Sequence, residues 1–122
     1  MQLSKTEEQL MAYLWQLESA LMKELIIEYD DPKPAATTIA TLLKRMSDKG
    51  FVSYETEGRS RRYFPLVKKD DYVTGRAQGL VKSFFGDSSS QFASFFTKST
   101  DFTKEELEEL KSIIDEQIEK KK

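Results

Sequence analysis

The chain contains 122 residues, with 19 basic and 21 acidic side chains and a formal net charge of −2. It has neither cysteine nor histidine, which excludes disulfides, thiol nucleophiles, zinc–thiolate sites and the commonest general base of enzymes. A chain of this length forms one small domain or two half-sized units that share a core. Taken over the whole chain, the near-neutral charge argues against nucleic acid as a partner.

No apolar segment approaches the ~20 residues that a membrane-spanning helix needs. The N-terminal sequence MQLSKTEEQL lacks the basic and apolar regions of a signal peptide. We therefore expect a cytoplasmic protein that does not insert into a membrane.

The net charge conceals an uneven distribution along the chain. Residues 1–32 contain two basic and seven acidic residues, a net charge of −5, whereas residues 33–68 contain eight basic and three acidic residues, a net charge of +5. Residues 69–122 contain nine basic and eleven acidic residues, a net charge of −2. A basic block between acidic ones indicates a local binding surface, although chance clustering on a solvated surface would produce the same counts.

Three helices are predicted in the first 50 residues. Ser4 and Glu7 have the spacing of a capping box, so the first helix begins at Ser4. Ser19 is expected to cap the second helix, and the third spans about 35–48 and ends before Gly50, a residue suited to the position after a helix. The apolar faces have helical spacing and comprise Leu10, Met11, Leu14 and Trp15, then Leu21, Met22, Leu25, Ile26 and Tyr29, then Ile39, Leu42, Leu43 and Met46.

After Gly50 the apolar period changes from 3.6 to 2, which predicts two strands over residues 51–55 and 61–66. Residues 56–60 contain Gly58 and form the loop of the hairpin. Residues 1–68 are therefore expected to form a domain of three helices followed by a β-hairpin.

Residues 69–122 are predicted to add three more helices. The first covers about 70–85, a short helix with three phenylalanines follows the serine run, and Thr103 and Glu106 form a capping box for the last. This region is too short to close a core of its own. We expect its apolar stripes to pair with a second copy of the chain; the alternative is that they fold back on the N-terminal domain of a monomer. The residues expected at the dimer interface are Leu80, Phe84, Phe92, Phe95, Phe96, Leu107, Leu110, Ile114 and Ile118.

The third helix and the hairpin carry side chains that suit DNA. A helix fits the major groove, where hydroxyl and cationic groups contact base edges and phosphates, and threonine methyls contact thymine methyls. Arg61 and Arg62 are adjacent in a strand and point to opposite faces, so only one of them is expected to share a ligand with Arg59. We expect Arg59 and Arg62 to hold the hairpin on the DNA backbone; the alternative is a charged hairpin that merely discourages aggregation. The candidate DNA-binding residues are Thr37, Thr38, Thr41, Lys44, Arg45, Arg59, Arg61 and Arg62.

No catalytic, metal or cofactor site is predicted. The acidic pairs at 105–106 and 108–109 complement a helix dipole or lie on a polar face, and no base lies near the serine run 88–90. No carboxylate cluster has the spacing of a calcium loop. We therefore do not expect an enzyme.

Four segments, in this order, carry a resemblance to a known family. They are EQLMAYLW over residues 8–15, TIATLLKRM and KGFV within 38–52, GR and RYFPLV within 58–67, and TKEELEEL over 103–110. Together they resemble the penicillinase-repressor and methicillin-resistance-repressor family (BlaI/MecI/CopY type) of bacterial transcriptional regulators. The resemblance implies a mainly α fold with a small β-hairpin wing, in which a winged helix-turn-helix over 1–68 precedes a helical dimerisation region over 69–122.

The resemblance also implies a function: a homodimeric repressor that binds palindromic operators in double-stranded DNA and blocks transcription. In the family, a membrane-bound sensor metalloprotease triggers cleavage of the repressor in its C-terminal region. The corresponding segment here is 92–97, and by position the cut bond joins Phe95 and Phe96. Ala40 stands where relatives often carry a larger polar or basic residue, and the paired cysteines of the copper-responsive relatives are absent.

A second class of function is compatible with the same pattern. A winged helix can serve as a protein-interaction module that does not bind DNA, and the acidic first 32 residues favour this alternative.

Overall fold

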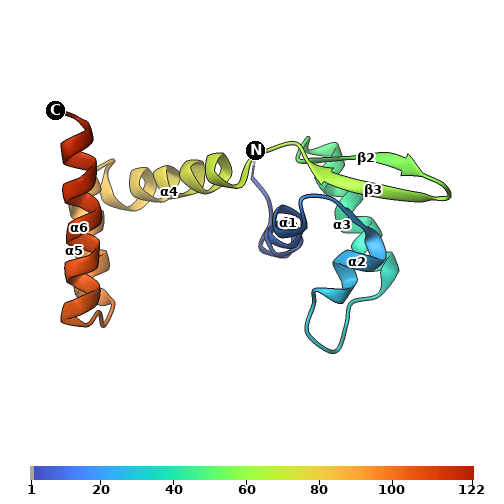
Figure 1. The fold of residues 1–122 in the computed structure, drawn as a ribbon, viewed down its shortest axis with the longest axis horizontal. Coiled ribbons are helices and arrows are strands. Elements are labelled where there is room, and N and C mark those ends of the chain that lie inside the picture. Colours follow the sequence, from blue (N-terminus) through green and yellow to red (C-terminus); the bar gives the residue numbers. More distant parts are fainter. Residues whose placement is uncertain (1) are drawn as a thin grey trace. The chain divides into compact units, whose positions relative to one another are not determined.

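The structure, a computed structural model, describes residues 2–122 and divides the chain into two compact units. The first unit ends at Thr74 and the second comprises Gly75–Lys122, so the boundary lies inside a helix (Figure 1). In chain order the elements are α1 (Lys5–Leu17), β1 (Ala20–Leu21), α2 (Met22–Ile27), α3 (Ala36–Asp48), β2 (Val52–Glu57), β3 (Ser60–Pro65), α4 (Lys69–Phe85), α5 (Ser89–Ser99) and α6 (Lys104–Lys120). Over the residues described, no helix combines the length and the apolar character needed to cross a bilayer.

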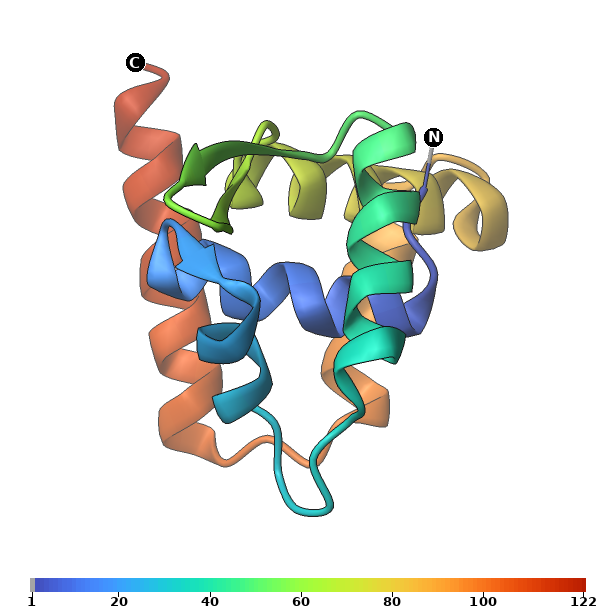
Figure 2. The same ribbon diagram turned by 90° about the vertical axis from the view of Figure 1, so that its right-hand side faces the viewer.

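The first unit consists of three helices and a small antiparallel sheet, which confirms the winged-helix prediction. The strand order is β1-β3-β2, and β2 and β3 form the hairpin that extends beyond the helices as a wing (Figure 1). Figure 2 shows α3 crossing α1 on one side of this unit. The core lies where the helices meet the base of the sheet, and its fully buried side chains include Leu10, Leu14, Leu25, Ile39, Leu43 and Met46.

The predicted start of α1 and the predicted bounds of α3 are confirmed. The Ser4 side chain accepts a hydrogen bond from the Glu7 N–H, and Glu7 accepts one from the Ser4 N–H, which completes the capping box of α1. The predicted apolar stripe of α3 is buried along its whole length. Gly50 follows the C-cap of α3 with φ +84°, the left-handed conformation that glycine adopts without steric cost.

The prediction that Ser19 caps the second helix is wrong. Residues 20–21 form the short strand β1, which pairs with β3 through Ala20↔Tyr63 and Leu21↔Arg62. The N-cap of α2 is Leu21, whose N–H donates to the Glu24 carboxylate at 2.7 Å. A two-residue strand has no periodicity of its own, and β1 exists because its backbone groups pair with β3.

The hairpin turn is tighter than expected. The ladder extends to Glu57↔Ser60, which leaves Gly58 and Arg59 as a two-residue loop. Gly58 has φ +64°, as the first loop position of a type II′ hairpin requires. The short turn fixes the strand register and therefore the face on which each wing arginine lies.

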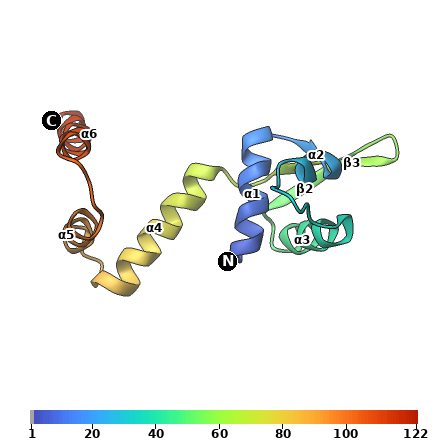
Figure 3. The ribbon, with the colours of Figure 1, turned by 90° about the horizontal axis from the view of Figure 1, so that it is seen from below.

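The second unit contains the remainder of α4 with α5 and α6, and its helices carry no buried residue in the described structure. The capping box at Thr103 and Glu106 is confirmed. Phenylalanine rings hold the turn between α4 and α5: Phe85 lies 5.6 Å from Phe92 and 5.5 Å from Phe95 between ring centroids. Figure 3 looks along the axes of α5 and α6. Most of the large apolar side chains on these two helices are exposed.

One buried ion pair joins the start of α1 to the end of α3. The Lys49 ammonium lies 2.6 Å from Glu7 Oε1, and the Glu7 side chain is only 1% exposed. Burial acts to raise the pKa of Glu7, but hydrogen bonds with Lys49 and Ser4 outweigh it, so the pKa lies below its usual value. The carboxylate therefore stabilises the first unit in its charged form.

We predict that Glu7→Gln, which keeps the capping geometry but removes the charge, destabilises the first unit by about 2 kcal/mol at pH 7. The contribution is complete above the ordinary glutamate pKa of about 4.3 and is lost as the pH falls through the lower pKa of the folded state. Urea unfolding at pH 7 and below pH 4 is followed by the fluorescence of Trp15, the only tryptophan, which lies in this unit.

Asp31→Asn is the matched control, because Asp31 faces Lys33 at 3.7 Å in an exposed ion pair worth little. The stability difference between Glu7→Gln and the unsubstituted protein should shrink in acid, whereas Asp31→Asn should differ little at either pH. An equal effect of Glu7→Gln at both pH values would contradict the role given to the carboxylate.

Candidate functional site

The surface of α3 carries a second stripe opposite its buried one. Thr37, Ala40, Thr41 and Lys44 are all exposed and have the spacing i, i+3, i+4, i+7. Each lies two positions from a member of the buried stripe, and two residues turn a helix by about 200°. Packing of one face into the core therefore presents the other face to solvent. Thr38 and Arg45 flank this stripe and are exposed as well.

The two adjacent wing arginines have different environments. The Arg61 guanidinium lies over the Tyr54 ring, 4.3 Å from its centroid. Arg62 projects to the opposite face, where its Nε lies 2.8 Å from Glu57 and its Nη1 3.5 Å from Glu24 of α2. Two carboxylates thus neutralise the charge of Arg62. The Arg61 guanidinium instead packs on an aromatic ring, and neither carboxylate neutralises it.

Two tyrosines position the Arg61 side chain. Tyr54 and Tyr63 are cross-strand partners with ring centroids 5.5 Å apart. A hydrogen bond with the Tyr63 side chain, followed by the electrostatic effect of Tyr54, raises the pKa of Arg61. The guanidinium, which is charged as in any arginine, is thereby held on one face of the wing.

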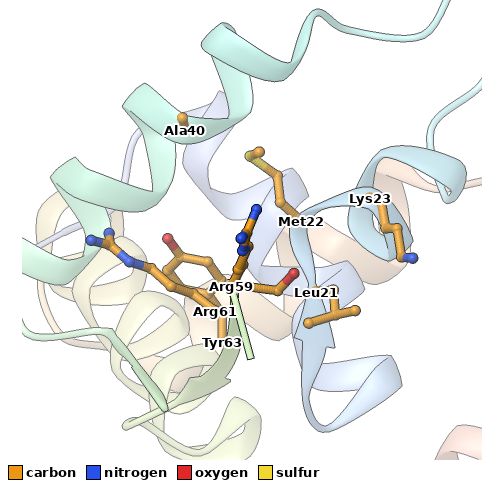
Figure 4. Close-up of a pocket in the computed structure, with 8 residues that line it drawn as sticks. Leu21, Met22, Lys23, Ala40, Arg59, Arg61 and Tyr63 are labelled. Carbon is orange, nitrogen blue, oxygen red and sulfur yellow. The ribbon is translucent and has the colours of Figure 1, made fainter. Parts of the chain in front are cut away.

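A pocket of about 450 Å³ lies between the wing, the start of α2 and the exposed face of α3. Figure 4 shows Arg59, Arg61 and Tyr63 on the wing side and Ala40 on α3. None of the eight residues that line it, all within the described chain, carries a carboxylate. They are Leu21, Met22, Lys23, Ala40, Arg59, Ser60, Arg61 and Tyr63. Three residues with cationic side chains, Lys23, Arg59 and Arg61, thus line one depression, which suits a polyanion.

The structure brings some of the predicted DNA-binding residues together and separates others. Arg59 and Arg61 line the same pocket, close to the exposed stripe of α3, whereas Arg62 lies on the other face of the wing. Lys44 lies 3.4 Å from Asp48, but both side chains are largely exposed and such a pair is easily exchanged for another partner.

Two contributors to this site, Lys23 and Tyr54, are not among the residues predicted from the sequence. Lys23 reaches the pocket because β1 places the start of α2 beside β3, and β1 has no sequence pattern. Tyr54 could have been found, because a two-residue turn at 58–59 pairs it with Tyr63 and sets it on the same face as Arg61.

The residues expected at a dimer interface lie in the second unit and are mostly exposed. Seven of the nine are exposed large hydrophobic residues, and Phe92 and Leu110 are half-buried. Phe84, at 78%, is the most exposed of them. Phe95 and Phe96, which flank the expected cleavage point, both lie within α5 and are also exposed. Among the described residues, no group of three or more acidic side chains is placed to hold a metal ion.

Sequence comparisons with known proteins span residues of both units. The family model described as "Penicillinase repressor" matches residues 3–116. The chain is 27% identical over 122 residues to a penicillinase repressor of Bacillus licheniformis, covering 99% of this chain and 95% of that one. It is 24% identical over 114 residues to the methicillin resistance regulatory protein MecI of Staphylococcus aureus strain N315, covering 93% of each chain.

A solved structure is similar as well. The solution structure of the DNA-binding domain of the repressor BlaI superposes with a TM-score of 0.52 at 32% sequence identity. The match covers 58% of this chain and 88% of that domain.

Proposed function

Starting from the fact that the chain belongs to the penicillinase repressor family of DNA-binding repressors, we propose that it is a homodimer that binds palindromic operators. In this proposal α3 enters the major groove and the wing contacts the flanking backbone. The contacts come from Thr37, Thr38, Thr41, Lys44 and Arg45 of α3, and from Arg59 and Arg61 of the wing.

The observation that carries this proposal is the position of Arg59 and Arg61 beside the exposed stripe of α3. A helix lying in a groove has a phosphate backbone on each side, and cations adjacent to the helix meet those phosphates. Arg62 is expected to contribute less to DNA binding, because Glu57 and Glu24 already neutralise its charge. The carboxylates that would repel DNA from the wing are thereby also satisfied.

We predict that the double substitution Arg59→Ala and Arg61→Ala weakens binding to all DNA sequences. It should reduce the slope of log affinity against log salt concentration by roughly 2, one unit for each phosphate contact removed. Fluorescence-anisotropy titrations of the protein's own upstream DNA at several salt concentrations provide the measurement.

The double substitution Lys5→Ala and Lys68→Ala removes the same charge from exposed positions outside the pocket, and should leave the slope nearly unchanged. Arg62→Ala should change it by less than 1, because this side chain is paired within the protein. An unaltered slope for the Arg59/Arg61 variant would show that the wing does not contact the DNA backbone. Absence of DNA binding by the unsubstituted protein would favour the protein-interaction alternative.

The second unit supports the dimer. Its 48 residues bury no side chain by themselves, and its last helix presents Leu107, Ile114 and Ile118 along one exposed stripe. A contiguous apolar surface of this kind on a stable protein marks an interface. A second copy of the chain supplies the same stripe, and a two-fold axis matches the symmetry of a palindromic operator.

Ile114→Glu is predicted to weaken self-association of the full chain at least about a hundredfold, because the two-fold axis brings two unpaired carboxylates into one apolar interface. Sedimentation equilibrium measures the dimer dissociation constant. Ser112→Glu adds the same charge on the polar face of α6 and should leave that constant within about twofold. Equal behaviour of the two variants would contradict the assignment of this stripe to the dimer.

We further propose that cleavage in α5 ends repression. Phe95 and Phe96 are exposed, and the Phe96 ring lies 5.7 Å from Phe92 and 5.3 Å from Phe102, which precedes the N-cap of α6. A cut between Phe95 and Phe96 separates α6 from the DNA-binding unit. The proposed agent is a membrane-bound sensor metalloprotease.

When the protein is co-expressed with a cognate sensor metalloprotease and the inducer is added, we expect cleavage of one bond within residues 92–97, which yields two fragments. Mass spectrometry of the purified protein identifies the bond. An intact mass after induction would refute this mode of control while leaving the DNA-binding proposal in place.

A further inference from the structure

The exposed stripe of α3 offers methyl groups where a recognition helix meets base edges. We infer that α3 reads thymine C5-methyl groups, through the methyls of Thr37, Ala40 and Thr41. This inference rests on the proposed function and specifies the base chemistry that the same surface recognises. Its basis is the chemistry of the stripe and one hydrogen bond.

The hydrogen bond determines which part of Thr41 faces a ligand. The Thr41 hydroxyl donates to the Thr37 carbonyl oxygen of the preceding turn at 2.9 Å. With its O–H turned back to the helix backbone, Thr41 presents its γ-methyl, and its oxygen keeps acceptor capacity alone. An exposed threonine in this state is an apolar contact rather than a hydrogen-bond donor.

The composition of the first two turns of α3 excludes bidentate base reading from that part of the helix. Residues 36–43, the first two turns of α3, contain no arginine, lysine, asparagine, glutamine or carboxylate. Those turns therefore cannot make the bidentate contacts by which arginine or lysine recognises guanine and an amide recognises adenine. The N-terminal part of a recognition helix is the part that contacts base edges. Apolar contact with thymine methyls is the specific interaction that alanine and threonine methyls can make there.

The residues around the exposed stripe of α3 suit contact with the DNA backbone, whereas the stripe itself suits contact with bases. Ala40 borders the pocket of Arg59 and Arg61, so the wing cations lie beside the methyl surface (Figure 4). Its small side chain allows the helix to approach the groove floor. Thr37 and Thr41 are separated by about 6 Å along the helix axis, which matches about two base steps. We expect a half-site that contains thymines one or two steps apart.

The test begins with duplexes selected from a random-sequence pool by the full-length protein. Each thymine of the selected site is then replaced singly by deoxyuridine, which lacks only the C5-methyl. At one to three thymines of each half-site the replacement should weaken binding about three- to fivefold, as burial of one methyl predicts, and elsewhere it should have no effect.

A double-mutant cycle links the effect to the helix. Thr41→Ser removes the γ-methyl but keeps the hydroxyl that bonds to Thr37, so it should abolish the uracil penalty at one thymine and leave the others. Thr6→Ser, an exposed threonine of α1, should leave every penalty unchanged.

The outcomes separate this inference from the function on which it rests. Selection of a defined site, with no thymine sensitive to uracil, overturns methyl reading and leaves DNA binding intact. An unchanged set of penalties in Thr41→Ser overturns the assignment to α3. Failure to select any sequence overturns the proposed function and the inference with it.

Discussion

Burial of one stripe of α3 is the constraint on which the candidate site depends. Ile39, Leu42, Leu43 and Met46 contribute to the core, and their burial fixes the rotation of the helix about its own axis. Because the periods of the two stripes are the same, no rotation that preserves the core can hide Thr37 or Thr41. The Glu7–Lys49 pair fixes the C-terminal end of the helix against α1. The core thus decides what the surface presents.

The central strand β3 does the same for the wing. It pairs with β1 on one side and β2 on the other, so the alternation of its side chains is set along its whole length. One arginine is directed to Glu57 and Glu24, and its neighbour to Tyr54 and the pocket. A one-residue slip would exchange them and place the paired guanidinium against the ligand. The two-residue turn at Gly58 and Arg59 opposes that slip.

Sequence periodicity predicts the elements that have a long apolar face and fails for those that exist through tertiary contact. The stripes of α1 and α3, the capping boxes at Ser4 and Thr103 and the period change at Gly50 all specify their structures locally. In contrast, β1 consists of two residues that are ordered by β3. The opposite faces of Arg61 and Arg62 followed from strand geometry, but Glu24 comes from α2 and no local pattern connects it with the wing.

In the proposed dimer, the charge distribution affects non-specific DNA affinity and the apolar contacts affect specificity. The first 32 residues carry a net charge of −5, so repulsion from phosphates offsets part of the attraction of the basic segment 33–68. Non-specific binding is weakened accordingly, and affinity has to come from specific contacts. Methyl contacts of about 0.8 kcal/mol each give a single helix little discrimination, whereas two half-sites held by one dimer double it in free energy and square it in affinity. Methyl contacts of this kind therefore discriminate effectively only in the proposed dimer, whose specificity would largely be lost if its C-terminal helices were separated.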